Sequence, residues 1–173
     1  QQFLSDVFWG DLDVLLLDLP PGTGDVTISV AQLLPGAEIL VVTTPQTAAA
    51  EVAERTGLIA VQTKQKVVGV VENMSYLPQP DGSRLEIFGS GGGLAVSRSL
   101  STALGYEVPL LARLPLDIAL REGSDAGVPV TVAADGAPAA DAPAALALAD
   151  VARRLGRVRR GLSGMKLSIS PVG

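Results

Sequence analysis

The sequence predicts an α/β fold in which a parallel sheet carries helices on both faces. Its strongest apolar runs lack polar alternation, which suits strands that are buried on both faces of a parallel sheet. Helical patterns separate these runs, so strands and helices alternate along the chain. The composition is 47% hydrophobic and only 3% aromatic, which favours an aliphatic α/β core over an all-β sandwich. The 173 residues suffice for one domain with a substantial core.

Four apolar runs are the predicted strands, and each is followed by a residue that can contact a ligand. The runs span 14–17, 37–43, 67–72 and 108–114, and the residues that follow them are Asp18, Thr44, Asn73 and Pro115. The carboxyl ends of parallel strands meet at one edge of a sheet, where open α/β folds bind ligands. We therefore expect these four residues along one rim.

The segments between the strands predict helices over 25–34, 45–63, 94–104, 118–122 and 143–156. Thr44 is a plausible N-cap with Pro45 at the first helical position, and Gly105 is a plausible C-cap. Asp81-Gly82 predicts a hairpin turn inside residues 76–88. A short extended segment is expected at 128–132, and Asp141 is a candidate cap of the last helix.

The chain divides into a main part and two short segments. We expect 1–134 to belong to a single domain, 135–158 to supply its final helix, and 159–173 to be a flexible tail. The first strand arrives almost at once after Gln1, as in a chain that begins inside a domain. A processed or engineered amino terminus would give the same pattern.

Charge and missing residue types exclude several classes of function. The net charge of −5 argues against a general nucleic-acid-binding surface. The sequence has no cysteine, hence no thiolate ligands for iron–sulfur clusters, and no histidine, the commonest general base. No apolar run approaches the length of a membrane span and no signal peptide is visible, so we expect a cytoplasmic protein.

The stretch DVLLLDLPPGTGD, residues 13–25, carries the clearest chemical signal. An acid such as Asp18, between a buried strand and a glycine-rich loop, holds Mg²⁺ in many nucleotide hydrolases, directly or through water. The N–H of Gly22 can approach a phosphate because no Cβ blocks it. A simpler interpretation remains open, in which Asp18 caps the turn and Asp25 is the N-cap of a helix that starts at Val26.

Two further motifs allow more than one interpretation. The amide of Asn73 offers both a donor and an acceptor to a purine edge, but Asn is equally common as a turn residue. The glycine run 89–93 lacks the Gly-Lys-Ser/Thr of a phosphate loop and follows a hairpin instead of a buried strand. We interpret it as a flexible or tightly packed loop.

Taken together, these stretches resemble the carboxyl-terminal half of Mrp/ApbC-type proteins. That family comprises P-loop ATPases, related to MinD and ParA, which act as iron–sulfur cluster carriers. The resemblance covers nearly the whole chain up to about residue 158. The matching stretches are DVLLLDLPPGTGD (13–25), VVTTPQ (41–46), GVVENMSY (69–76), EIFGSGGG (86–93), PLLARLPLD (109–117) and the final Ala/Arg-rich helix.

The resemblance implies roles for individual residues in a Mg-ATP site. Asp18 would be the Walker B acid that holds Mg²⁺, and Gly22 would face the γ-phosphate. Asn73 would contact the adenine, while Pro115 and Leu116 would line the base pocket. Asp25 would help to position the attacking water. The family further implies a homodimer that serves iron–sulfur client apoproteins.

The sequence departs from the family pattern in two places. The phosphate loop that precedes the Walker B strand in the family is absent, so we expect the chain alone to bind ATP poorly and not to hydrolyse it. The Cys-x-x-Cys pair that commonly follows NMS is replaced by residues 77–82, LPQPDG, so the chain offers no iron–sulfur ligands. Two alternatives therefore stand beside the cluster carrier: a MinD/ParA-like positioning ATPase and a non-catalytic interaction module.

Overall fold

The computed structural model describes residues 6–20, 22, 24–131 and 142–156. Their elements follow the chain in the order α2 (Asp25–Leu33), β1 (Ile39–Thr43), α3 (Thr47–Gly57), α4 (Ile59–Thr63), β2 (Val67–Glu72), β3 (Leu77–Pro78), β4 (Arg84–Leu85), α5 (Gly92–Leu104), β5 (Leu110–Arg113), α6 (Ile118–Ala126) and α7 (Pro143–Gly156). The predicted α/β class with a parallel sheet is confirmed.

The main sheet has three parallel strands in the order β1-β2-β5, with β2 in the middle. Thr43 is paired with Glu72, and Glu72 is paired with Arg113. The last residues of all three strands are therefore level with one another. Because helices connect the strands and make them parallel, the carboxyl ends of the strands lie at one rim of the sheet.

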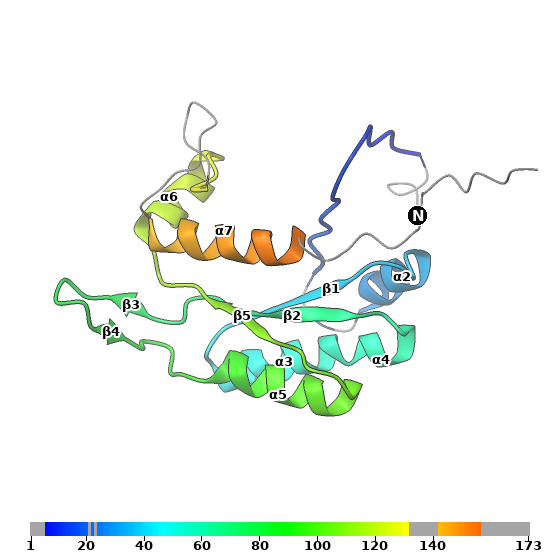
Figure 1. Cartoon of the computed structure of the whole chain (residues 1–173), viewed down its shortest axis with the longest axis horizontal. Coiled ribbons are helices and arrows are strands. Elements are labelled where there is room, and N and C mark those ends of the chain that lie inside the picture. Colours follow the sequence, from blue (N-terminus) through cyan, green and yellow to red (C-terminus); the bar gives the residue numbers. More distant parts are fainter. Residues whose placement is uncertain (1–5, 21, 23, 132–141, 157–173) are drawn as a thin grey trace, which may run out of the picture.

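Helices cover the sheet on both sides, and the central strand contributes to a core on each. Figure 1 shows α3 and α5 against one face and α7 across the other. Successive side chains of a strand point to opposite faces, so Val70 packs with Val96 and Leu100 under α5, whereas Val71 packs with Val151 of α7. This two-sided burial explains why the β2 sequence is apolar without alternation.

Several local predictions are confirmed. Gly105 ends α5 with a left-handed backbone at φ 74°. Leu77 pairs with Leu85 across the predicted hairpin, which projects from the sheet in Figure 1. Helix α7 has the predicted bounds.

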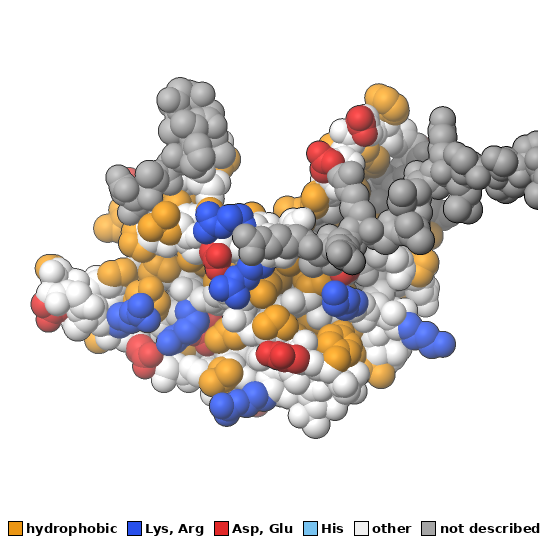
Figure 2. Space-filling view, viewed as in Figure 1, with side chains coloured by type: hydrophobic (Ala, Val, Ile, Leu, Met, Phe, Trp, Pro, Cys, Tyr) orange, Lys and Arg blue, Asp and Glu red, His pale blue; other side chains and the backbone are white. Residues whose placement is uncertain are grey.

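The predicted strand at 14–17 is wrong for this structure. These residues form no strand, and Leu16 is 81% exposed. Within the described residues, β1 pairs only with β2, so the run has no strand beside it, and its four exposed side chains lack the cover that a buried strand has. A parallel strand is stabilised by that cover, which propensity cannot replace. Figure 1 shows this dark blue segment standing away from the sheet, and Figure 2 shows hydrophobic side chains on it.

Several boundaries differ from the sequence predictions. The helix expected at 45–63 is two helices that meet at Leu58, and its first part begins at Thr47, not Pro45. The N-cap of α3 is Gln46, because the Thr44 hydroxyl donates to the Gln46 side chain instead of accepting from α3.

Near the carboxyl end, α6 continues past Gly123 to Ala126, where Gly127 adopts the left-handed conformation that ends it. Residues 128–131 contain no strand, so the extended segment expected at 128–132 is wrong in its described part. Asp141 and the tail at 159–173 lie outside the described residues.

Candidate functional site

Backbone hydrogen bonds join the segments that leave the three strands of the main sheet. The N–H of Asn73 donates to the Thr43 carbonyl at 2.8 Å, which ties the exit of β2 to the end of β1. The N–H of Ser75 donates to the Leu114 carbonyl at 2.8 Å, and the N–H of Leu116 donates to the Tyr76 carbonyl at 2.7 Å. The structure thus places the Asn73 turn beside the segment that contains Pro115 and Leu116.

The turn after β2 has an unusual backbone. The side-chain oxygen of Asn73 accepts a hydrogen bond from the Met74 N–H at 2.9 Å. Met74 has φ 53°, a conformation that costs free energy in a residue other than glycine. Asn73 therefore serves its own turn through its oxygen, while its side-chain NH₂ makes no hydrogen bond within the described part of the chain. That group is free to meet a ligand.

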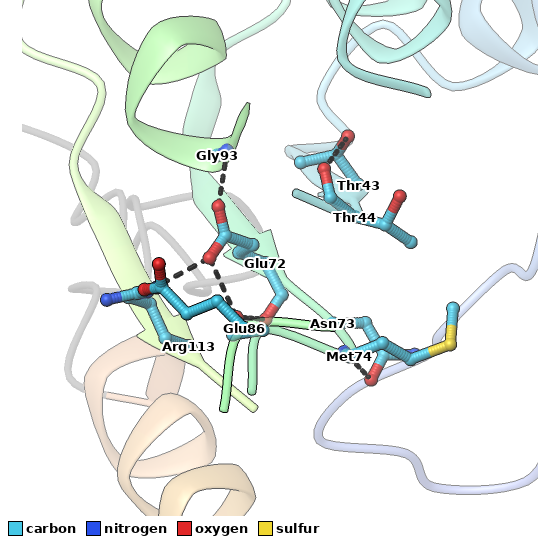
Figure 3. A network of polar contacts seen from close by, with 9 residues as sticks. Thr43, Thr44, Glu72, Asn73, Met74, Glu86, Gly93 and Arg113 are labelled. Carbon is cyan, nitrogen blue, oxygen red and sulfur yellow. Dashed lines mark hydrogen bonds and ion pairs between the residues drawn. The ribbon is translucent and has the colours of Figure 1, made fainter. Parts of the chain in front are cut away.

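Next to this turn lies a fully buried carboxylate, that of Glu72. One of its oxygens accepts from the Gly93 N–H at 2.7 Å; the other accepts from the Ser75 hydroxyl at 2.8 Å and from Arg113 Nε at 2.9 Å. The guanidinium of Arg113 also reaches Glu86 beyond the hairpin, at 3.1 Å. Figure 3 shows the Glu72 side chain between Gly93 and Arg113.

The electrostatics of this cluster keep Glu72 ionised. Burial alone would raise its pKa, but the hydrogen bonds from Gly93, Ser75 and Arg113 together with the Arg113 charge lower the pKa below its ordinary value. The same contact with Glu72 raises the pKa of Arg113, against the opposing effect of desolvation. A charged pair thus lies at the rim where the strands end.

Neither Glu72 nor Arg113 was predicted as a site residue, although the sequence carries a signal for them. Each stands at the end of an apolar run, VVGVV and LLA, in strands predicted to be buried. A charge at such a position needs a partner, because an isolated buried charge is very costly. Two opposite charges at the ends of two strands of one parallel sheet predict an ion pair.

The glycine run before α5 is a tightly packed loop. A Cβ on Gly92 would lie 2.6 Å from the carbonyl oxygens of Thr44 and Pro45. A Cβ on Gly93 would lie 2.8 Å from the Cβ of Glu72. The first turn of α5 already donates to a carboxylate, that of Glu72. Of the two alternatives, flexible or tightly packed, the loop is therefore tightly packed.

The predicted magnesium and phosphate residues lie before and at the start of α2. Asp18 is exposed, and its carboxylate makes no hydrogen bond or ion pair within the described ranges. Gly22 has φ 94°, and its carbonyl accepts from the Thr27 hydroxyl at 3.3 Å. Asp25 is the first residue of α2, with Gly24 as N-cap, so Asp25 is not the N-cap itself. Within the described residues, no hydrogen bond joins Asp18, Gly22 or Asp25 to the Asn73 turn.

Two negative findings apply to the described residues. They contain no group of three or more histidine, cysteine, aspartate or glutamate side chains placed to hold a metal ion. None of their helices is both long and apolar enough to cross a membrane.

Comparison with known protein families gives a match over residues 1–154, to the ParA family described as NUBPL iron-transfer P-loop NTPase. A protein of Mycobacterium leprae named iron–sulfur cluster carrier protein is 60% identical over 171 residues, which is 99% of this chain and 43% of that protein. A protein of the same name from Synechocystis is 44% identical over 149 residues, or 85% of this chain and 40% of that protein. The chain thus spans less than half the length of these curated relatives.

Solved structures agree with the fold. A nucleotide-binding protein from Archaeoglobus fulgidus, solved in complex with ADP, is 40% identical with a TM-score of 0.59 and covers 73% of this chain and 50% of that one. The cell division ATPase MinD of Pyrococcus furiosus is 22% identical with a TM-score of 0.50 over 72% of this chain and 44% of that one. The second likeness shows the fold alone, which is that of a P-loop NTPase.

Proposed function

Because this chain belongs to the ParA family of NUBPL-type iron-transfer P-loop NTPases, we propose that it forms part of an ATP-dependent iron–sulfur cluster carrier. In this proposal, the carboxyl rim of the sheet contributes the base side of a Mg-ATP site. One observation carries it: the Asn73 turn and the segment of Pro115 and Leu116 lie side by side at this rim, joined by backbone hydrogen bonds.

The base side of the site has a simple chemistry. The side-chain NH₂ of Asn73 donates to a ring nitrogen of adenine, and the half-buried Leu116, with the buried Pro115 beside it, offers apolar surface to the face of the base. Pro115 lacks an N–H, so it adds no competing donor. The ADP-bound relative from Archaeoglobus fulgidus supports nucleotide binding in a protein of this fold and 40% identity.

The phosphate side rests on Asp18, Gly22 and Asp25. Mg²⁺ prefers carboxylate oxygens and commonly takes only one or two of them, with phosphates and waters completing its shell. Asp18 is exposed and makes no ion pair with any described residue, so it fits this requirement as a single ligand, directly or through water. Bound Mg²⁺ would neutralise charge on the phosphates. Gly22 would present its N–H to the γ-phosphate, and Asp25 would orient the attacking water.

This chain offers no side-chain ligands of the usual kinds to the iron–sulfur cluster that such a carrier would transfer. The sequence contains neither cysteine nor histidine, so it supplies no thiolate or imidazole to a cluster. This favours a second candidate, a MinD/ParA-like ATPase whose nucleotide state positions another partner. A non-catalytic interaction module is the third candidate. We further propose a cytoplasmic homodimer that, as a carrier, would act on apoprotein clients.

The test uses the complete natural protein that contains this chain. After anaerobic reconstitution with iron and sulfide, bound iron and Mg-dependent ATP hydrolysis are measured on the same sample. The carrier proposal expects both. Hydrolysis without iron would support the positioning ATPase, and the absence of both would support the interaction module.

A matched pair of variants tests the role of Asp18. Asp18→Asn should abolish Mg-dependent hydrolysis, because the amide loses the charge that holds the cation. Asp125→Asn, at an exposed aspartate of α6 that pairs only with Arg121 among the described residues, should leave hydrolysis unchanged. Equal activity in both variants would contradict the magnesium role.

A further inference from the structure

We propose that Glu72 is a positioning residue that sets base specificity at the nucleotide rim, by holding the Asn73 turn at a fixed spacing from the segment of Pro115 and Leu116. This inference rests on the proposed function, because it requires a nucleotide base at that rim. It assigns a task to a residue that itself touches no nucleotide.

The first support is the way Glu72 closes the turn. The Ser75 hydroxyl lies 2.8 Å from a carboxylate oxygen of Glu72 and 2.9 Å from its carbonyl oxygen. Residues 73 and 74 are thereby held between two ends that are bonded to each other. The positive φ of Met74 persists because the surrounding contacts overdetermine the turn. Without the Glu72 carboxylate, the turn loses one of the bonds that maintain this backbone.

The second support comes from the other side of the rim. The same carboxylate oxygen that Ser75 contacts also accepts from Arg113 Nε, at the end of β5. The Glu72 carbonyl accepts from the Leu114 N–H at 2.8 Å, and the Leu114 carbonyl accepts from Ser75. Glu72 therefore contacts the β2 turn and the β5 exit together, and the latter leads directly into Pro115.

The third support is that Glu72 is itself immobilised. Its side chain is 1% exposed, and its second oxygen accepts from the first turn of α5 at Gly93. Because the Glu72 carboxylate is held by three donors, the groups that bond to it are held at fixed positions as well. In Figure 3, the Asn73 and Met74 side chains extend away from the Glu72 cluster. The Glu72 carboxylate thus contacts the turn on the side opposite the Asn73 side chain and leaves the space around that side chain open to a ligand.

A positioning role and a merely structural role predict different binding data. If Glu72 only stabilises the fold, its loss weakens binding of every nucleotide by the same factor. If Glu72 aligns Asn73 with the base pocket, its loss weakens the nucleotide whose base Asn73 reads more than the others. The ratio of the Kd for Mg-GTP to the Kd for Mg-ATP separates the two.

The experiment measures both Kd values by calorimetric titration on the complete natural protein. Glu72→Gln is the main variant, and Ser75→Ala is the second, which decides the matter if the first does not fold. Ser97→Ala is the matched control. It removes another buried side-chain hydrogen bond, from the Ser97 hydroxyl to the Val108 carbonyl at 2.7 Å, between α5 and the segment before β5.

We expect the wild-type protein to prefer ATP, and the Kd ratio to fall about tenfold in Glu72→Gln and less in Ser75→Ala. A tenfold change corresponds to about 1.4 kcal/mol. Ser97→Ala should keep the wild-type ratio. A wild type that prefers ATP, with unchanged ratios in both rim variants, would overturn the inference but not the proposed function. A wild type that does not distinguish the two nucleotides would overturn the base-reading role of Asn73 as well.

Discussion

Replacement of Glu72 by glutamine should cost the folded chain about 1.5–4 kcal/mol at pH 7. A glutamine oxygen that keeps the contacts with Ser75 and Arg113 turns its NH₂ toward the Gly93 N–H, only 2.7 Å from the present oxygen. One buried donor is then unsatisfied, which costs about 1–3 kcal/mol. The lost attraction to Arg113 adds only about 0.5–1 kcal/mol, because the Arg113 side chain is 35% exposed and solvent screens it.

Urea unfolding followed by circular dichroism measures this loss across a pH series. The pKa of Glu72 is lower in the folded chain than in the unfolded chain, so its stabilisation is complete above the ordinary value of 4.5 and disappears as the pH falls through the folded pKa. The difference between wild type and Glu72→Gln should therefore shrink below about pH 4.5. Glu86→Gln, at the 42% exposed partner of Arg113, should lose less than about 1 kcal/mol. A loss below about 0.5 kcal/mol for Glu72→Gln, or one independent of pH, would refute the reasoning.

Three further substitutions probe the packing, each measured by the same unfolding assay. Gly92→Ala should lose about 1–3 kcal/mol, because its Cβ would meet backbone carbonyl oxygens at 2.6 Å, whereas Gly156→Ala, with open space around it, should change stability by less than about 0.5 kcal/mol. Leu100→Ala should lose about 2–5 kcal/mol from the fully buried core, and the 41% exposed Leu94→Ala far less; equal losses would contradict the assigned core. Gly127→Ala should lose about 1 kcal/mol through its φ of 68° alone, and an unchanged midpoint would count against that left-handed cap.

The sequence was sufficient to predict those elements whose stabilising partners are near in the chain. The hairpin around Asp81-Gly82, the end of α5 at Gly105 and the bounds of α7 depend on turn chemistry, glycine conformation and helical periodicity. Each of these signals is local. The strand at β2 was also predictable, because its burial on both faces leaves a continuous apolar run.

The predictions that failed concern structure that depends on partners distant in the sequence. The run 14–17 has the composition of a buried strand, but composition cannot supply the neighbouring strand and covering helices that such a strand requires. The break at Leu58 has only a weak local signal, because Gly57 before it lowers helix propensity without requiring the helix to end. Of the four residues predicted to share a rim, Thr44, Asn73 and Pro115 lie where β1, β2 and β5 end, whereas Asp18 follows no strand. Glu72 was overlooked because two of its partners, Gly93 and Arg113, come from distant segments.

The long sequence separation between Glu72 and Arg113 has a consequence for biosynthesis. Arg113 follows Gly93 by 20 residues, which a ribosome adds in about 1–4 s at about 5–20 residues per second. During that interval, the nascent chain has its central strand and the start of α5 but not the counter-ion of Glu72. Burial of the carboxylate is unfavourable at this stage. The rim should therefore assemble only when β5 emerges, as a late and cooperative step of synthesis.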